Sequence, residues 1–481
     1  MRMKQAIIYW YRQDLRTRDL AGLRAAAATG MPVIPCYILD DQAHEQCTLG
    51  AASRWWLHHS LVSLADDMGD LGGKLVLRRG PTAEVLDDLL AETGAQTIYC
   101  SRLYEPWADK LEKHLHDRFE ERGVTFKRYP GSLLFEPDQI LTGSNAPFKV
   151  FTPFWRRCRN ATPPAPAQPL PKDIHWYSQE CASDDIASWA LTPRSPDWAL
   201  RWPTLWRPGQ AGASERLKSF LGGPVGNYAD GRNHPALEAT TRLSPHLHFG
   251  ELSPRTIWHA TMDVSNQRPE LRDQTDKFLS ELGWREFSHH LLFHFPHIVN
   301  APFKTQFEQF PWLGNETALR AWQRGVTGYP IVDAGMRELW QTGYMHNRIR
   351  MVVASFLTKH LLVDWRSGAR WFWDTLLDAD LANNTCGWQW VAGSGADASP
   401  YFRIFNPIIQ GEKFDEDGIY IRRWVPELAA LPDRYLNRPW EAPDDVLAAA
   451  HVTLGEHYPH PIVDHKSARE SALAAYASLK S

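Results

Sequence analysis

The sequence predicts an α/β domain, built as a doubly wound, Rossmann-like parallel sheet of five strands, followed by an all-helical domain. Two observations lead to this prediction. Over residues 1–135, short runs rich in β-branched and aromatic residues alternate with longer helical patterns. From residue 206 to 481 helical patterns predominate. Residues 136–205 form a connector, whose proline-rich stretch ATPPAPAQPLPKD cannot be helical inside.

Strands and helices alternate in the first domain. The strands are predicted at residues 6–11, 32–40, 74–80, 97–103 and 124–129, and the helices between them at 19–30, 53–73, 82–95 and 107–123. No G-x-G-x-x-G motif follows the first strand, so the usual dinucleotide site is not indicated. A scaffold without any bound group fits this domain equally well.

The second domain carries helical patterns of several lengths. They lie at residues 214–223, 253–264, 275–295, 316–325, 332–343, 345–363 and 367–382. Many of the 22 tryptophans fall after residue 280. Such an excess is unusual, although structural packing accounts for some of it.

Composition and charge exclude several classes of protein. The 481 residues suffice for two or three domains, and no apolar run approaches the roughly 18 residues of a membrane span. The six cysteines are scattered without a C-x-x-C pair, which predicts a reduced, cytoplasmic environment and no metal site. The net charge of −4 gives no global sign of nucleic-acid binding, so any such surface must be a local basic patch.

Hydroxyl groups gather in the segment ATTRLSPHLHFGELSPR. Thr240, Thr241 and Ser244 supply hydroxyls, Arg242 supplies a fixed charge, and the SPR that ends the segment is typical of a helix start. Backbone amides and hydroxyls just before a helix suit a phosphate or pyrophosphate. A hydroxyl-rich helix start without a ligand fits the same residues.

The segment SELGWREF combines a carboxylate, a flat ring and a guanidinium on one helix face. Glu281 lies three and four residues before Trp284 and Arg285. A carboxylate can accept hydrogen bonds from the edge of a base while a ring beside it stacks on the base. The alternative is a surface pair of Glu281 and Arg285 beside a half-buried tryptophan.

The segment GYMHNRIRMVVASF is basic and helical in pattern. Asn347 and Met351 share one face, and His346 and Arg350 share the neighbouring face. Six Lys or Arg residues stand against two acids over residues 337–370. This excess fits a phosphate backbone, and it also fits the solvated side of a helix.

The segment DADLANNTCGWQW combines acids, amides and two tryptophans. Asp378 and Asp380 are placed so that one of them can pair with Arg350 and be buried. If GWQW is helical, a rotation of 100° per residue points the rings of Trp388 and Trp390 about 200° apart. The two rings then face different neighbours.

Together these motifs resemble the photolyase/cryptochrome family, and within it the class I bacterial photolyases that repair cyclobutane pyrimidine dimers in DNA. The opening WYRQDLRTRD, the hydroxyl-rich segment, and ELGWREF, YMHNRIRM, DADL, GWQW and SPYFRIFNP follow the family's order over nearly the whole chain. The resemblance implies a carbon–carbon lyase whose helical domain binds FAD. It also implies light-driven electron transfer from excited FADH⁻ to a dimer flipped out of DNA.

The resemblance assigns roles to individual residues. Asn384 corresponds to the asparagine at flavin N5, although a shift of one residue would place Asn383 there. The electron-transfer chain corresponds to Trp312, Trp365 and Trp388. The FAD contacts correspond to Tyr228, Thr240, Thr241, Arg242, Leu243, Ser244, Phe278, Glu281, Arg285, Asn347, Arg350, Asp378, Ala379, Asp380 and Asn384. The pocket for the dimer corresponds to Arg232, Glu281, Trp284, Asn347, Arg348, Met351 and Trp390.

The chain departs from the family's pattern at several positions. Gly283 stands where a bulkier apolar residue is frequent, and Thr385 and Cys386 replace small or amide residues before the GWQW motif. Trp107 and Ala108 occupy the places of an Asn-Glu pair that binds folate in some members. A second, antenna chromophore is expected, and folate in another mode, a deazaflavin, FMN and an empty site all stay open.

Two other members of the family are alternatives to dimer repair. A cryptochrome senses blue light without repair, but repair-type residues fill the lesion-side positions here, and the chain ends about where the family core ends. A (6-4) photolyase uses a pair of histidines for proton transfer, whereas here His346 is followed by Asn347. The expected partner is damaged DNA, single- or double-stranded, with no membrane and no obligate protein partner. The chain is expected to be a monomer.

Overall fold

The computed structural model describes residues 6–42, 48–398 and 403–479, which form two compact units. The first unit comprises Met1–Gly226 and Thr241–Pro296, and the second comprises Asn227–Thr240 and His297–Ser481. The start of the SPYFRIFNP motif, residues 399–402, lies outside the described residues. The predicted division at residues 135 and 205 rests on sequence pattern alone and stays a prediction.

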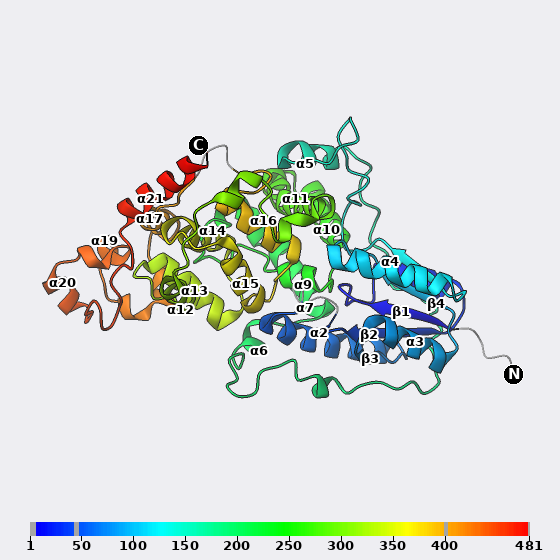
Figure 1. Ribbon diagram of the computed structural model, residues 1–481. Helices are drawn as coiled ribbons and strands as arrows, with labels where there is room; N and C mark the ends of the chain where they lie inside the picture. Colours follow the sequence, from blue (N-terminus) through cyan, green and yellow to red (C-terminus); the bar gives the residue numbers. More distant parts are fainter. Residues whose placement is uncertain (1–5, 43–47, 399–402, 480–481) are drawn as a thin grey trace. The chain divides into compact units, whose positions relative to one another are not determined.

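The first unit contains the predicted sheet of five parallel strands. The strands pair in the order β3-β2-β1-β4-β5. Their bounds are β1 Ile7–Tyr11, β2 Val33–Leu39, β3 Val76–Arg79, β4 Thr97–Ser101 and β5 Thr125–Tyr129. The helices between them are α1 Ala21–Ala28, α2 Ala51–Asp70, α3 Thr82–Thr93 and α4 Pro106–Glu120. Figure 1 shows helices on both sides of this sheet, so the doubly wound fold class is confirmed.

Alternation along β1 directs its side chains to opposite faces of the sheet. Ile8 and Trp10 pack with Leu89 of α3 and other buried residues of α3 and α4 in one core. Tyr9 faces the other side, where a Cβ added to Gly22 of α1 would come within 2.9 Å of its ring. All residues of β1 are buried, as expected for a strand covered on both faces.

The rest of the first unit is helical or irregular. Its further elements are α5 Phe151–Arg159, η2 Ile186–Trp189, α6 Trp202–Leu205, α7 Gln210–Gly222, α9 Ser244–His248, α10 Pro254–Gln267, η4 Pro269–Leu271 and α11 Arg272–His294. The proline-rich stretch at residues 161–173 contains no helix, as the sequence predicts. The predicted connector nevertheless contains α5, which the sequence analysis does not predict.

The second unit is largely helical, as predicted. Its helices are α8 Tyr228–Gly231, α12 Glu316–Arg324, α13 Pro330–Thr342, α14 Asn347–Ser355, η7 Phe356–His360, α15 Trp365–Thr375, α16 Leu381–Ala392, α17 Pro407–Phe414, α18 Ile419–Trp424, α19 Asp433–Leu436, α20 Asp444–Ala449 and α21 His465–Ser478. Short turns η6 Thr305–Gln309, η8 Pro426–Leu428 and η9 Pro439–Glu441 complete it. Within the described parts of the chain, no helix is long and apolar enough to cross a membrane.

Two helices predicted from the sequence are interrupted in the structure. The pattern at residues 345–363 forms α14 and then a π-helical turn, η7. The helix predicted at residues 367–382 ends at Thr375, because Leu376 is extended and Asp380 caps a new helix, α16, that begins at Leu381. Helical periodicity continues across both breaks, so it does not reveal them.

Candidate functional site

The start of α16 is fixed by an acidic cap. Asp380 precedes the helix, and its Oδ1 accepts hydrogen bonds from the backbone N of Asn383 at 2.8 Å and from that residue's Nδ2 at 2.7 Å. Such a cap satisfies donors that the first turn leaves unpaired. Asn383 is therefore bound back to the cap rather than directed along the helix.

Asn384 takes a different direction from Asn383. Its Nδ2 donates to the backbone O of Ala369 in α15 at 3.0 Å. This contact holds the amide against α15 and directs the amide oxygen away from that carbonyl, because the amide group is planar. The two asparagines thus make different contacts, and Asn383 rather than Asn384 binds the cap through its side chain.

Arg350 and Asp378 form an ion pair, as the sequence predicts for one of the two acids. Arg350 Nη2 donates to Oδ2 of Asp378 at 2.8 Å and to Oδ1 at 3.0 Å, and its Nε donates to the backbone O of Met345 at 2.8 Å. Burial acts to lower the pKa of Arg350, but the charge and hydrogen bond of Asp378, together with the charges of Tyr344 and Glu338, outweigh it, and the pKa is raised. The pair links α14 to the loop before α16.

Three predicted tryptophans belong to the core of the second unit. Trp365 and Trp388 are each 2% exposed within one hydrophobic cluster, and Trp312 packs against that cluster while staying half-buried. Trp388 lies edge-on to Phe372 and Trp322, at centroid distances of 5.0 and 6.2 Å. The three predicted rings therefore share one aromatic core, with Trp312 the most accessible.

The two tryptophans of GWQW lie in one helix, the condition on which the prediction of separate ring directions depends. Trp388 and Trp390 both lie in α16, and Trp388 is buried whereas Trp390 is half-buried. Gln389 between them is also buried. Its Nε2 donates to the carbonyls of Ile298 and Ala301, and its Oε1 accepts from the backbone N of Phe303 at 2.8 Å. The amide thus fastens α16 to the loop at residues 298–303.

A buried lysine holds the other end of α16. Lys359 in η7 is 1% exposed, and its Nζ donates to the backbone O of Ala392 at 2.6 Å. A cation at the C-terminus of a helix complements the negative end of the helix dipole. Burial holds the pKa of Lys359 well below its usual value. Neither this residue nor Gln389 is predicted from the sequence, because neither occurs in a recognisable pattern.

Basic side chains gather at the start of α14. Arg348 Nη2 donates to Oδ1 of Asn233 at 2.6 Å, and its guanidinium lies 4.2 Å from the ring centre of Phe414. Burial and the charges of Arg232 and Arg403 lower the pKa of Arg348, so three guanidiniums lie close enough to repel one another. An anion between them would relieve this repulsion.

The predicted carboxylate, ring and guanidinium of α11 make separate contacts. Glu281 pairs with Lys277 one turn earlier, at 3.0 Å. Arg285 Nη1 donates to the backbone O of Ser132 at 3.0 Å and to the buried Glu286 at 3.2 Å. Trp284 is half-buried. Arg285 therefore links α11 to the loop after β5.

The hydroxyl-rich segment turns sharply before α9. Arg242 has a positive φ of 50°, which non-glycine residues seldom adopt, and the backbone N of Leu243 donates to Thr241 Oγ1 at 3.2 Å. Thr241 is half-buried and Ser244 is exposed. The turn therefore brings the Thr241 hydroxyl onto the backbone of Leu243, next to the start of α9.

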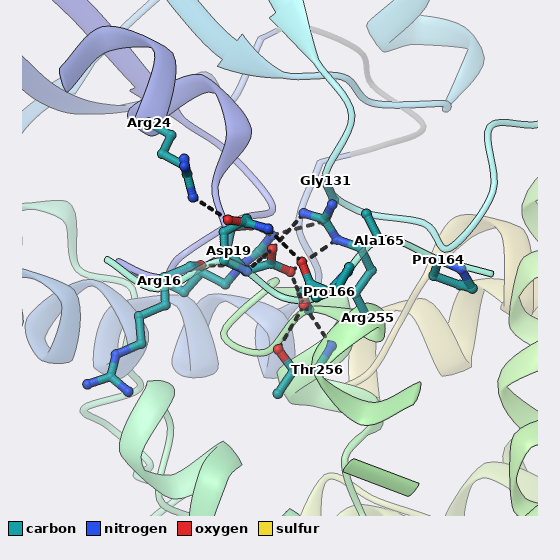
Figure 2. Close-up of polar contacts among 12 residues, drawn as sticks. Arg16, Asp19, Arg24, Gly131, Pro164, Ala165, Pro166, Arg255 and Thr256 are labelled. Atoms are coloured by element: carbon teal, nitrogen blue, oxygen red, sulfur yellow. Dashed lines mark hydrogen bonds and ion pairs between the residues drawn. The ribbon is translucent and has the colours of Figure 1, made fainter. Parts of the chain in front are cut away.

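The loop after β1 contacts the C-terminal end of the hydroxyl-rich segment, at residues 250–255 (Figure 2). Asp19 accepts from Arg255 Nη2 at 2.7 Å, from Ser253 Oγ, and from the backbone N of Gln168 at 2.9 Å. Arg16 donates to the backbone O of Gly250 at 2.8 Å. Asp19 thus ties the start of α10 and the proline-rich stretch to the sheet.

A second buried acid holds the same segment from inside. Glu251 is fully buried and accepts from Trp56 Nε1 at 3.0 Å and from the backbone N of Gly209 at 2.7 Å. It also contacts His246 Nδ1. A buried carboxylate requires such partners, and here they come from α2, from the residue that precedes α7, and from α9.

The structure distributes the predicted site residues over both units. The first unit holds Thr241, Arg242, Leu243, Ser244, Phe278, Glu281, Trp284 and Arg285. The second unit holds Tyr228, Arg232, Thr240, Trp312, Asn347, Arg348, Arg350, Met351, Trp365, Asp378, Ala379, Asp380, Asn384, Trp388 and Trp390. Tyr228, Leu243, Phe278 and Ala379 are buried, whereas Asn347 is exposed.

Known proteins resemble this chain over its whole length. Residues 7–172 match DNA photolyase, and residues 278–478 match the FAD binding domain of DNA photolyase. A deoxyribodipyrimidine photo-lyase from Agrobacterium fabrum is 50% identical, covering 100% of this chain and 99% of the relative. Cryptochrome-1 of Arabidopsis thaliana is 37% identical, covering 95% of this chain and 68% of the relative.

A solved structure supports the same family. The bacterial class III photolyase from Agrobacterium tumefaciens has a TM-score of 0.96 and 49% identity, covering 99% of this chain and 98% of that one. Because that protein is named a class III photolyase, the comparisons support the family but not the class I subdivision that the sequence motifs resemble. FAD is the cofactor of the matched helical domain. The chain belongs to the photolyase/cryptochrome family.

Proposed function

We propose that the chain repairs cyclobutane pyrimidine dimers in damaged DNA under blue light. The observation that carries the proposal is the 50% identity, over the whole chain, to a protein named deoxyribodipyrimidine photo-lyase. Cryptochrome-1 is less similar, at 37% identity. The start of α14 supports dimer repair over (6-4) repair, which uses a pair of histidines for proton transfer. Here the single His346 is followed by Asn347, and His346 Nδ1 accepts from the backbone N of Arg348 at 3.2 Å and so caps the helix.

The residues fit FAD by their chemistry. The hydroxyls and amides of Thr240–Ser244 suit a diphosphate, and Ser244 at the end of this turn is exposed. Asp380 and the Asn384 oxygen are acceptors suited to N–H and O–H groups of a flavin. When bound, FAD supplies the light-excited electron that splits the dimer and takes that electron back.

The protein's own groups have three proposed tasks. Trp312, Trp365 and Trp388 pass electrons inward to reduce an oxidised cofactor. Asn384 offers an amide oxygen as acceptor at flavin N5 and has no acidic proton to give. The apolar shell around Trp388 excludes water from the redox site.

The lesion-side residues are proposed to bind a flipped dimer. Trp284 and Trp390 offer rings for stacking, and Glu281 and Asn347 offer hydrogen-bonding groups to base edges. Arg232 and Arg348 accompany them with charges that suit phosphates. Met351 completes this set. Flipping costs less for a damaged, poorly stacked pair, and this difference contributes selectivity.

Illumination of the purified protein tests the proposal. The absorption spectrum should show flavin bands, and light should restore pyrimidines in dimer-containing oligothymidine. Flavin without light-dependent repair would favour the cryptochrome alternative, and absence of flavin would contradict FAD binding. Chromatography of the released chromophores distinguishes folate, a deazaflavin and FMN as the antenna, and gel filtration tests the predicted monomer.

A substitution separates the two electron pathways. Trp388→Phe should slow photoreduction of oxidised flavin, because phenylalanine is far harder to oxidise than tryptophan. The same variant, reduced chemically beforehand, should repair dimers at nearly the normal rate. Equal loss of both activities would contradict the proposed role of Trp388.

A further inference from the structure

One helix of the first unit presents a basic face that the proposed site does not use. The stretch KVFTPFWRRCR around α5 contains four basic residues and no acid. Arg156 and Arg157 are exposed. Among the residues that the structure describes, no carboxylate forms an ion pair with either of them. Arg159 differs, because it pairs with Asp276 at 3.1 Å.

The opposite face of α5 is apolar. Phe151, Phe154 and Cys158 are buried, at spacings of three and four residues that place them on one stripe. Phe154 lies 5.2 Å from Phe287 of α11 between ring centres. The stripe fixes α5 against α11, so the two arginines project from a rigid element rather than from a mobile loop.

The packing of α5 reaches the ring proposed to face the lesion. Phe151 lies parallel to Trp284, with a centroid distance of 3.8 Å and an interplanar angle of 8°. Trp155 occupies the space beside Gly283, where an added Cβ would lie 2.5 Å from its ring. Phe151 therefore covers one face of the Trp284 ring, and Trp284 as a whole stays half-buried.

We propose that α5 is a DNA-contacting helix: Arg156 and Arg157 bind phosphates beside the lesion, and Phe151 positions Trp284 for the flipped base. The inference rests on the proposed repair function and names a surface for it. A guanidinium without a carboxylate partner is free to bind a phosphodiester. Because the whole chain carries a net charge of −4, attraction to DNA needs such local patches.

The two arginines and the Trp284 ring recognise different features of DNA. Phosphate contacts hold any DNA, damaged or not, and carry the salt dependence of binding. Stacking on Trp284 needs an extruded base and therefore distinguishes the lesion. Variants of the arginines and of Phe151 should accordingly change different quantities.

Salt-dependent binding tests the arginines. The double variant Arg156→Gln/Arg157→Gln of the flavin-loaded protein is compared with wild type in the dark, on duplexes with and without one thymine dimer. Both affinities should fall by the same factor, roughly tenfold, and the slope of log affinity against log salt should fall by about 2. The preference for the dimer should not change.

A matched control uses two other exposed arginines of the first unit. The variant Arg194→Gln/Arg201→Gln makes the same chemical and charge change in the segment that leads into α6, and Figure 1 shows α6 far from α5. Its salt slope should equal that of wild type. An unchanged slope in the Arg156→Gln/Arg157→Gln protein, or an equal drop in this control, would overturn the phosphate contacts.

A change at Phe151 tests the positioning of Trp284. Phe151→Ala should lower affinity for the dimer-containing duplex by about tenfold, because stacking on an aromatic ring contributes that much. Affinity for undamaged duplex should stay within twofold, and Phe151→Tyr should restore the preference. Flavin absorbance and the melting temperature report whether the variants are folded.

The outcomes separate this inference from the function on which it rests. If Phe151→Ala lowers both affinities equally while flavin and melting are unchanged, Phe151 does not position Trp284. If wild type itself shows no preference for the dimer, the proposed repair function fails. The salt slopes on undamaged duplex would still decide whether α5 binds DNA.

Discussion

The ring of Trp388 rests on a glycine where α15 and α16 cross. A Cβ added to Gly368 would lie 2.1 Å from Cη2 of Trp388 and 2.5 Å from its Cζ3. Carbon atoms normally approach no closer than about 3.5 Å, so the ring would have to move by more than about 1 Å. Phe372 and Trp322, both buried, leave it no space to do so.

Two opposing effects set the size of the change in Gly368→Ala. Alanine stabilises a helix interior by about 0.5–1 kcal/mol relative to glycine. Overpacking a core costs typically about 1–3 kcal/mol, and a clash with a rigid ring belongs at the upper end. The free energy of unfolding should therefore fall by about 2 kcal/mol.

Gly387 of α16 provides a matched control. Gly387 is exposed. Apart from its chain neighbours and the backbone of its own helix, no described heavy atom lies within 4 Å of the position that an added Cβ would take. The same glycine-to-alanine change should there raise the free energy of unfolding by about 0.5–1 kcal/mol. Identical substitutions on two adjacent helices are thus expected to have opposite signs.

Urea unfolding of the flavin-free protein measures both effects, and photoreduction of the flavin-loaded protein adds a functional result. Gly368→Ala should also slow photoreduction, because the clash displaces the Trp388 ring. If Gly368→Ala were as stable as wild type and photoreduced at the same rate, the glycine would not set the position of the ring. A change of the same sign in the free energy of unfolding of Gly368→Ala and Gly387→Ala would also contradict this explanation.

Three further predictions concern other buried contacts. Burial lowers the pKa of His360 to about 3, so the stability that its neutral form provides is complete above about pH 6.5 and decreases as the pH falls toward 3. Urea titrations of the wild-type protein should therefore show that the free energy of unfolding is about 2 kcal/mol lower at pH 5 than above pH 6.5. This loss should be smaller in His360→Asn. Asp19→Asn leaves Arg255 without its charged partner, and thermal unfolding should show a loss of about 3 kcal/mol. Gly283→Leu should destabilise by about 1–3 kcal/mol through a clash with Trp155, and a double-mutant cycle with Trp155→Ala should recover part of that loss.

The sequence predicts the fold class because its periodicities are strong. Buried strands such as Ile7–Tyr11 are continuous apolar runs, and the helices between them are amphipathic or bounded by glycine. The pair of Arg350 with one of the nearby acids also follows from residue type and spacing. Helix α5 is missed because its buried stripe has only three residues, in a region otherwise rich in proline.

Other parts of the site depend on contacts between segments distant in sequence. Gln389 looks like a spacer between two tryptophans, yet its amide binds a loop some ninety residues earlier. Asn383 and Asn384 are identical in type, and only the cap at Asp380 shows which one is already occupied. Sequence spacing cannot supply such information, because it fixes direction along one helix and not the partner across from it.

At two helix crossings of this chain, the ring of a tryptophan on one helix packs against a glycine on the other. Helices pack about 8–10 Å apart, and an indole ring fits between them only where the opposite residue has no side chain. Trp388 on Gly368 and Trp155 on Gly283 both meet this condition. Trp388 Nε1 is buried without a hydrogen-bond partner in the described part of the chain, so packing alone determines the direction of that ring. The position of the ring proposed to transfer electrons then depends on a residue that carries no redox chemistry, and a change at Gly368 should be as informative as a change at Trp388.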